Sequence, residues 1–378
     1  MKCISLAFPF LLLAACGDNV RDSDAPDAGP PDGPDLRAGK AAIVAGDFNQ
    51  TGVLSTVEAP SMVVTPNAVA GIASSDPVIR RIGDELFVVN RLVGNNVVIL
   101  DATTLALVTQ IAIGAGTNPQ DVAVVGTKLY LPVYNAAGVA VVDRAHPDQV
   151  TTIDLGDLDP NDNLPNCSSA YAVGARVFVT CQILDNDGSF AVTGPGKLVV
   201  IDSSDDTVET TIDLATVNPQ GFLIAVGSDL YTQGNNYLDP TAGCLARITT
   251  GATPTSECVI ENRDTTGYAN HVAVIGDDLF LTINWYDTEA PYAAHGTLHR
   301  VDVSAKTLGP ALLDAADVPR DLAACGEYLF VADKATDVEG IRVFHAAGGD
   351  FSEETSTALQ IGLPPLIGDG IACMNVPL

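Results

Sequence analysis

An internal repeat limits the fold of this chain more than any other sequence feature. The repeated unit is an apolar strand rich in β-branched residues, a glycine with one or two further turn residues, and a second apolar strand. Six copies occur at intervals of 43 to 53 residues, with their turns at Gly83, Gly126, Gly174, Gly227, Gly276 and Gly326. Two further strands usually follow each hairpin, so a unit holds four strands in roughly 48 residues. This pattern leaves no room for a helix of useful length.

Four-stranded repeats of this length are typical of β-propeller blades. The two ends of the chain supply a seventh blade, because 41–46 (AAIVAG) is similar to a second strand and 369–373 (DGIAC) to a first strand. We therefore predict an all-β, seven-bladed β-propeller with four antiparallel strands per blade, formed by residues 41–378. The N- and C-terminal strands share one blade, and this closure removes the open edges that would invite aggregation.

Several segments match a known repeat. Residues 86–90 read LFVVN, 96–104 read NVVILDATT and 118–120 read NPQ, and parts of this pattern recur at 197–202 and 218–220. The pattern resembles the YVTN family of bacterial surface propellers, a WD40/YVTN-like fold. The resemblance implies a seven-bladed ring on a secreted or anchored protein. It implies no single activity, because a propeller is a scaffold for many functions.

The N-terminus has the form of an export signal. Lys2 precedes an apolar stretch, 4–15, that is too short to span a bilayer. It ends in LAACG at 13–17, which resembles the lipobox of bacterial lipoproteins. The resemblance implies removal of a signal peptide, 1–15, and a lipid on Cys16. The alternative is an ordinary secretory signal with a chance cysteine.

Residues 16–40 are rich in Asp, Pro and Gly, and we expect them to form a disordered tether after the lipidated cysteine. The chain is then an exported protein anchored by its lipid, which we place at the outer membrane, on the periplasmic side or the cell surface. We expect a monomer.

The cysteines support export. Apart from Cys3 and Cys16, six of the eight cysteines remain, and an even number in an exported chain favours disulfides. Two pairs flank hairpin turns with a separation of 14 residues, and the third is left over: Cys167–Cys181, Cys244–Cys258 and Cys325–Cys373. Equivalent positions in neighbouring blades point the same way, so the third bond needs a shifted closing strand. The chain has no CxxC motif, which disfavours zinc.

Charge excludes one class of partner. The chain has 18 Lys and Arg against 47 Asp and Glu, for a net charge of -29. Such an acidic protein repels phosphate backbones, so we expect no nucleic-acid binding.

Carboxylates recur at two positions of the repeat. Four of them end a third strand before a polar turn, where a structural role in the turn is favoured over catalysis: Asp101, Asp143, Asp202 and Asp302. His271, Asp321 and Asp369 instead open the innermost strands of consecutive blades. Together they are candidate ligands for a divalent cation. Against this, inner-strand side chains point toward neighbouring blades, and an Asp at a strand start often caps a loop.

Two oxygen-rich loops, Asp185–Ser189 and Asp157–Asn163, are similar to calcium turns but lack the spacing of an EF-hand. Ca²⁺ or another divalent cation is the cofactor that such sites would take. Ordinary Asx turns are the favoured interpretation of both loops.

Long loops between the second and third strands carry aromatic and amide residues. The candidate ligand-binding residues, with His271, are Asn235, Tyr237, Asn284, Trp285 and Tyr286. Exposed aromatic rings with amides suit a glycan, peptide or protein ligand. The alternative is that the rings cover the small core of their own loop.

Three functions follow from these patterns. The first is a lipid-anchored binding module that uses the loops at the mouth of the channel. The second is a metal-assisted hydrolase or lyase that uses His271, Asp321 and Asp369, and the third is a purely structural envelope module. No motif of a known enzyme class occurs, which favours binding over catalysis.

Overall fold

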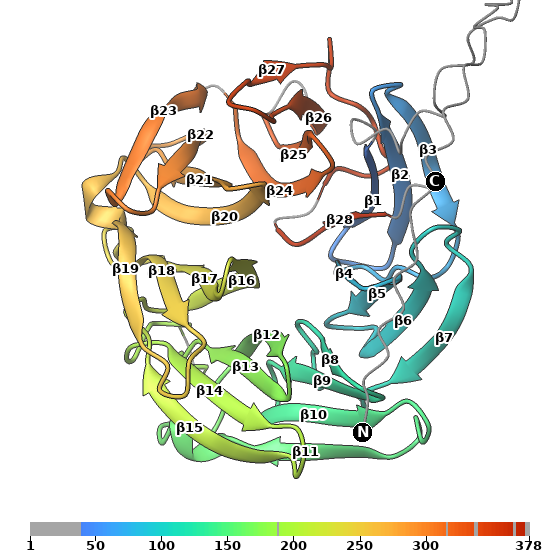
Figure 1. Ribbon diagram of the computed structural model, residues 1–378, viewed down its shortest axis with the longest axis vertical. Coiled ribbons are helices and arrows are strands. Elements are labelled where there is room, and N and C mark those ends of the chain that lie inside the picture. Colours follow the sequence, from blue (N-terminus) through green and yellow to red (C-terminus); the bar gives the residue numbers. More distant parts are fainter. Residues whose placement is uncertain (1–38, 187–188, 315–316, 336–338, 366–367, 375–378) are drawn as a thin grey trace, which may run out of the picture. The chain divides into compact units, whose positions relative to one another are not determined.

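The computed structural model describes residues 39–186, 189–314, 317–335, 339–365 and 368–374. The signal peptide, Cys16 and nearly all of the tether lie outside these residues. The described residues form seven four-stranded antiparallel sheets in a ring (Figure 1). The predicted seven-bladed β-propeller is confirmed. Helical structure in the described part is limited to two short 3-10 turns, η1 (Gly156–Leu158) and η2 (Asn262–Asp264), and no helix there is long and apolar enough to cross a membrane.

Each sheet runs from a strand beside the central channel to a strand on the outside of the ring (Figure 1). The first four sheets contain β28 (Ile371–Cys373), β1 (Gly39–Gly46), β2 (Gly52–Ala59) and β3 (Val63–Val69); β4 (Pro77–Ile82), β5 (Glu85–Asn90), β6 (Asn96–Asp101) and β7 (Leu107–Ala112); β8 (Ala123–Val125), β9 (Lys128–Val133), β10 (Gly138–Asp143) and β11 (Val150–Asp154); and β12 (Cys167–Val173), β13 (Arg176–Cys181), β14 (Lys197–Asp202) and β15 (Thr207–Asp213). The other three contain β16 (Pro219–Val226), β17 (Asp229–Gly234), β18 (Cys244–Thr249) and β19 (Ser256–Glu261); β20 (Tyr268–Ile275), β21 (Asp278–Tyr286), β22 (Ala294–Asp302) and β23 (Thr307–Leu313); and β24 (Pro319–Cys325), β25 (Tyr328–Asp333), β26 (Gly340–His345) and β27 (Ser352–Glu353).

The glycines of the repeat lie in the turns between the first and second strands. All six have φ between 58° and 62°, in the left-handed region. A residue with a Cβ is strained there, whereas glycine is not. This backbone requirement explains why the turn marks the repeat so regularly in the sequence.

The first and last described strands lie in one sheet. β28 pairs with β1, and Ile371 is opposite Ile43. Just before β28, the carbonyl of Asp369 accepts a hydrogen bond from the backbone N–H of Ile79 in β4, at 2.8 Å. The C-terminal strand therefore contacts the sheets on both sides of it. This contact fixes the position of Asp369 beside the channel.

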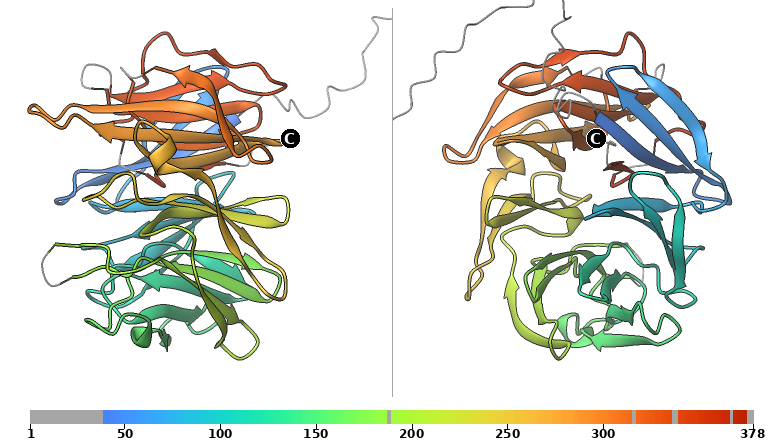
Figure 2. Two further views of the ribbon diagram at one scale, coloured as in Figure 1. Left: turned by 90° about the vertical axis from the view of Figure 1, so that its left-hand side faces the viewer. Right: turned by 45° about the vertical axis from the view of Figure 1, so that its right-hand side comes forward.

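The hydrophobic core is divided among the contacts between neighbouring sheets. One cluster joins Phe87 of β5 to Leu131 of β9, and both side chains are fully buried. The side views show the sheets packed face to face around the ring, with loops on both faces (Figure 2). Because each sheet is covered on both sides, the channel strands are held rigidly by their neighbours.

The aspartates that end the third strands have the structural role predicted for them. Oδ1 of Asp101 accepts backbone hydrogen bonds from Thr103 and Thr104. Asp143, Asp202 and Asp302 accept equivalent bonds in their own turns. These hydrogen bonds lower the pKa of all four carboxyls, which therefore remain ionised at neutral pH.

Two of the three predicted disulfides are present. Cys167 bonds to Cys181 across β12 and β13, and Cys244 bonds to Cys258 across β18 and β19. The third prediction, Cys325–Cys373, is not borne out, because both residues are free thiols. They lie on β24 and β28, the inner strands of neighbouring sheets, and their thiols are within hydrogen-bonding distance of each other without forming the bond.

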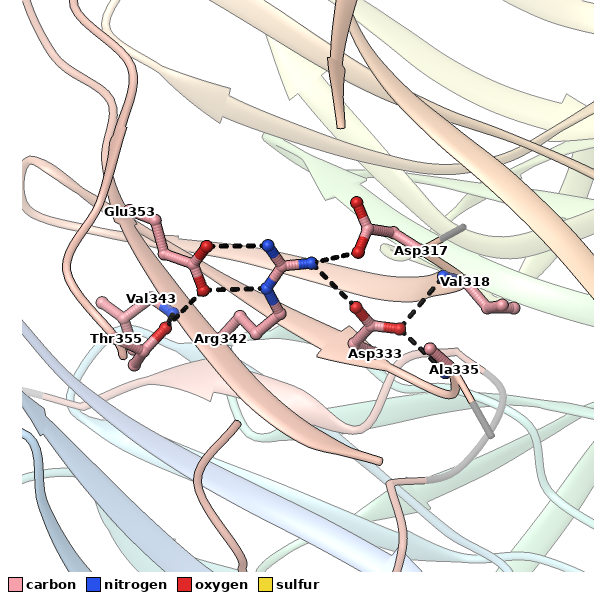
Figure 3. A network of polar contacts seen from close by, with 8 residues as sticks. All are labelled: Asp317, Val318, Asp333, Ala335, Arg342, Val343, Glu353 and Thr355. Carbon is pink, nitrogen blue, oxygen red and sulfur yellow. Dashed lines mark hydrogen bonds and ion pairs between the residues drawn. The ribbon is translucent and has the colours of Figure 1, made fainter. Parts of the chain in front are cut away.

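A polar network holds the start of β24 in place (Figure 3). Arg342 of β26 contacts Asp317 at 2.5 Å, Asp333 at 3.0 Å and Glu353 at 2.7 Å. The other oxygen of Asp333 accepts the backbone N–H of Val318 at 3.0 Å. Because β24 carries Asp321, this network also positions the channel wall.

Candidate functional site

The channel opens on one face into a cavity of about 490 Å³, which we call the mouth. The innermost strand of each sheet begins on this face. The loops that join the second strand of a sheet to its third strand lie on the same face. Much of the wall is formed by amide side chains: Gln120, Gln182, Asn218, Gln220 and Asn270. Amides both donate and accept hydrogen bonds without carrying charge. The mouth therefore suits a polar ligand.

Large apolar side chains lie on the loops of the mouth face, and we call them the mouth rim; two of them, Phe190 and Tyr237, line the mouth itself. The rim side chains lie in or beside the loops between second and third strands and are exposed: Phe48, Leu92, Val93, Phe190, Tyr237, Leu238, Tyr286 and Tyr292. The other exposed large apolar residues lie on strands, such as Val208 on β15 and the adjacent Leu107 and Val108 on β7. A collection of exposed aromatic groups on one face is typical of a binding surface.

The two tyrosines predicted from the loops do face solvent at the rim. Tyr237 is 65% exposed, lines the mouth, and accepts a hydrogen bond from Nε2 of Gln220 at 2.5 Å. Tyr286 is 50% exposed, and its hydroxyl accepts a hydrogen bond from Arg320 at 2.9 Å. The guanidinium of Arg320 also lies over the ring of Tyr286, 5.1 Å from its centroid. Both rings are therefore held in place while one side stays open.

Three other residues predicted to bind a ligand are instead packed within the fold. Trp285 belongs to β21 rather than to a loop, and its partly buried ring stacks on His295 with centroids 5.4 Å apart. Asn284 is fully buried and donates a hydrogen bond to the carbonyl of Pro319 at 3.0 Å. Asn235 is also buried. The hairpin of β21 and β22 is longer than the sequence indicates, which draws Asn284 and Trp285 into the sheet.

His271, Asp321 and Asp369 lie near one another between the mouth and a deeper part of the channel, a region we call the waist. His271 and Asp369 line both the mouth and a deeper channel cavity of about 230 Å³, and Asp321 lines the deeper cavity. Nδ1 of His271 is 3.6 Å from Oδ1 of Asp321. A Cβ on Gly368 would lie 2.2 Å from Nε2 of His271, so only glycine allows this close approach.

The waist does not have the arrangement of a metal site. Oδ1 and Oδ2 of Asp321 accept backbone hydrogen bonds from Leu322 and Gly370, at 2.9 and 2.7 Å. Oδ1 of Asp369 accepts the backbone N–H of Phe222 at 3.1 Å. Within the described ranges, no three His, Cys, Asp or Glu side chains are grouped so as to hold a metal ion. The metal-assisted reaction on these three residues stays a prediction that this arrangement does not favour.

The oxygen-rich loops likewise give no calcium site in the part of the chain that is described. In the loop Asp157–Asn163, Asp159 accepts the backbone N–H of Asn161, as an Asx turn does. The other loop, Asp185–Ser189, includes residues 187 and 188, which lie outside the described residues.

Burial determines the charge of the waist. Withdrawal from water raises the pKa of Asp321 to about 6, although nearby His271 opposes the rise. Burial also raises the pKa of Asp369 to about 6, and the charge of Asp121 adds to this effect. The same desolvation lowers the pKa of His271. At neutral pH the waist therefore holds two carboxylates beside an uncharged imidazole.

An ion pair close to Asp369 was missed by the sequence reasoning. Arg80 contacts Asp121 through two nitrogens, at 2.7 and 2.8 Å, and its guanidinium lies 4.1 Å from the centroid of Phe222. Asp121 also accepts hydrogen bonds from the hydroxyl of Ser169 and the N–H of Ala170. The sequence does carry a signal for this pair, because Arg80 follows the buried apolar residues of an inner strand.

Comparisons with known proteins support the fold, but they do not assign the chain to a family. The sequence matches no protein-family model and no curated protein. Among solved structures, the chain is similar to hydrazine synthase from Kuenenia stuttgartiensis (15% identity, 77% of this chain and 89% of that chain, TM-score 0.52). It is also similar to AztD from Citrobacter koseri (13%, 90% and 99%, TM-score 0.51) and to a "putative 6-phosphogluconolactonase" from Bacteroides fragilis (12%, 90% and 98%, TM-score 0.58). These identities establish a β-propeller and no activity.

Proposed function

We propose that this protein is a lipid-anchored, exported β-propeller that binds a glycan, peptide or protein through the mouth and the mouth rim. The observation that carries the proposal is a polar cavity lined by Phe190 and Tyr237, on a face of the ring whose loops expose further aromatic side chains. Amide groups give directional hydrogen bonds, and tyrosine rings add contact area with little loss of conformational entropy. Preformed sites of this kind lose little free energy to ordering when a ligand binds.

Two observations support export and anchoring. The two disulfides are stable in an oxidising compartment outside the cytoplasm. The LAACG sequence at 13–17 ends an apolar segment as a lipobox does. A diacyl or triacyl modification of Cys16 would hold the ring durably at a membrane, whereas one acyl chain holds a protein only marginally.

Arrays of glycans and peptides test the binding face. We expect the full chain to bind a subset of the array, and Tyr237→Ala to weaken these interactions about tenfold or more, as loss of an aromatic anchor does. Val208→Ala removes an exposed apolar group from β15 and is the matched control, which should leave binding unchanged. Binding that Tyr237→Ala does not weaken, or the absence of any bound ligand, would exclude the mouth rim as the binding face.

Metabolic labelling tests the anchor. Cells that express the full chain and are fed a radioactive fatty acid should incorporate label into the wild-type protein and the Cys3→Ser variant. The Cys16→Ser variant should remain unlabelled. Label that persists in Cys16→Ser would refute lipidation at this position.

A further inference from the structure

Within the described residues, the waist contains two carboxylates that form no ion pair with a Lys or Arg, although the positive charges of Arg80 and Arg91 act on Asp369 from farther away. Asp121 is paired with Arg80, but Asp321 and Asp369 have no Lys or Arg within ion-pair distance in the described ranges. The nearest basic group is His271, which burial keeps uncharged at neutral pH. Buried charges without a partner are costly, so a cation at this position would be stabilised.

A buried amide at the same place points to a ligand. Gln233 is 2% exposed and lines the channel cavity, and its Oε1 atom has no hydrogen-bond partner. The backbone at Gly221 packs closely against this amide and places it beside two waist residues. A Cβ at position 221 would clash with Nε2 of Gln233 at 2.4 Å and would lie 3.4 Å from Cε1 of His271 and 3.6 Å from Oδ1 of Asp369. Because buried acceptors are rarely left without a donor, Gln233 is an acceptor available to a ligand at the waist.

The channel cavity below the waist adds an aliphatic wall. Its volume is about 230 Å³, which is room for roughly seven water molecules. The apolar side chains that line it include Ile224, Val272, Leu322 and Ile371. A hydrated metal ion gains nothing from such a wall, whereas an alkyl chain is removed from water there.

We propose that the waist binds a primary ammonium group on an unbranched alkyl chain, the chemistry of a small linear amine. An ammonium has three hydrogen-bond donors, which the carboxylates of Asp321 and Asp369 and Oε1 of Gln233 accept. The alkyl chain lies along the aliphatic wall of the channel cavity. This site goes beyond the proposed function, because the alkyl chain lies in the deeper cavity and no residue of the mouth rim takes part, although Asp369 lines both cavities.

Titration calorimetry of the full chain with n-pentylammonium chloride at low salt tests the site. We expect saturable binding that Asp369→Asn weakens about tenfold or more, because a charge-assisted hydrogen bond is lost. Gln233→Met should also weaken binding. Asp202→Asn removes the same charge from an exposed turn and should leave the affinity unchanged, which separates the waist from the general acidity of the surface. Equal affinity in Asp369→Asn and Asp202→Asn would overturn the proposal.

Both variants are compatible with the fold. Asn keeps the acceptor for the N–H of Phe222 and tolerates the positive φ of residue 369. Met has the length of Gln and leaves no buried polar atom without a partner. Equal or higher melting temperatures would show that lost binding reflects a lost contact. If both variants stay folded and still bind as the wild type does, the site is wrong.

Two further probes establish the chemistry. Uncharged n-pentanol should not bind, and binding equal to that of the amine would refute an ammonium site. A blocked Ala-Lys-Ala peptide presents the same group on a side chain, so binding of the peptide at the waist identifies a lysine-bearing ligand, and binding of the free amine alone identifies a free amine. Tyr237→Ala should leave amine binding unchanged, so this site and the mouth rim can fail separately.

The affinity should fall as the pH is lowered below about 6. Asp321 and Asp369 then become protonated, and protonation of His271 adds a repelling charge. The other charged groups around the waist are the Arg80–Asp121 pair, Arg91 and Arg320, and the arginines do not titrate in this range. An affinity that is the same at about pH 7.5 and about pH 5 would contradict the assignment.

Discussion

Asp369 is held in a conformation that most residues avoid. Its φ is 57°, and it lies between Gly368 and Gly370. Its side chain accepts the N–H of Phe222 on one side of the channel, and its carbonyl accepts the N–H of Ile79 on another. The strain and the partly buried charge are maintained by the surrounding sheets, an arrangement that is common at functional sites.

Substitution of Asp369 by Asn should stabilise the fold at high pH. The pKa of this carboxyl is about 6 in the folded state against 3.8 when unfolded, so the folded state holds more protons between these values. Stability from this group is therefore lost as the pH rises through that range. Guanidinium unfolding at about pH 8 should show a gain of about 1–3 kcal/mol in Asp369→Asn, with a smaller gain at about pH 5.

Asp202→Asn is the matched comparison for this effect, because hydrogen bonds lower the pKa of Asp202 instead of raising it. It should show no gain at about pH 8. A loss of stability in Asp369→Asn at both pH values would mean that the carboxylate is not strained by burial.

Arg80 should be much more costly to remove than an exposed arginine. Arg80→Met leaves Asp121 buried and charged without its partner, which typically costs about 3–5 kcal/mol. The double variant Arg80→Met with Asp121→Asn should lose less than the single variant. Arg263 pairs with Glu261 on the surface, so Arg263→Met should change the unfolding free energy by less than about 1 kcal/mol. If the double variant is as unstable as Arg80→Met, the ion-pair account is wrong.

At the scale of strands, the sequence predicts which segments form each sheet, but it does not predict where the strands end. Hairpin glycines and alternating apolar residues predict each four-stranded unit, because both depend on local backbone conformation. The length of β21 depends instead on cross-strand pairing of Tyr286 with Ala294 beyond the predicted loop. That pairing has no local signal, so the sequence predicts a loop at Trp285 although this residue lies in a sheet.

The disulfides show the same limit. Cys167–Cys181 and Cys244–Cys258 follow from hairpin geometry and are confirmed. The free thiols Cys325 and Cys373 lie on the inner strands of different sheets, and their relation depends on how the ring closes. A contact between two strands that meet only when the ring closes cannot be predicted from the spacing of cysteines along the chain.

Each hairpin disulfide should contribute measurably to stability. Its two cysteines are 14 residues apart, and closure of such a loop is worth about 3 kcal/mol in the chain-entropy model. The double variant Cys167→Ala with Cys181→Ala should lose about this much in guanidinium unfolding. Cys373 forms no disulfide and so closes no loop, and Cys373→Ala should therefore lose less unfolding free energy. Equal stability of the double variant and the wild type would contradict the entropic account.

At the scale of the whole ring, the two faces and the channel have different characters. The mouth face has polar amides and exposed rings, while the waist behind it has two carboxylates that form no ion pair with a Lys or Arg of the described chain. The sequence predicted the ring and several mouth residues, because the repeat indicates which positions begin inner strands. It did not predict the grouping of Gln233 with His271 and Asp369, since these residues come from strands whose contact depends on the closed ring.

Hydrogen–deuterium exchange of the full chain, with and without a ligand from the arrays, tests the central claim most directly. A ligand that binds the mouth should slow exchange in the loops 189–196 and 235–243 and near the start of β20, and leave β15 and β19 unchanged. Protection confined to the outer strands, or to the opposite face of the ring, would contradict the account.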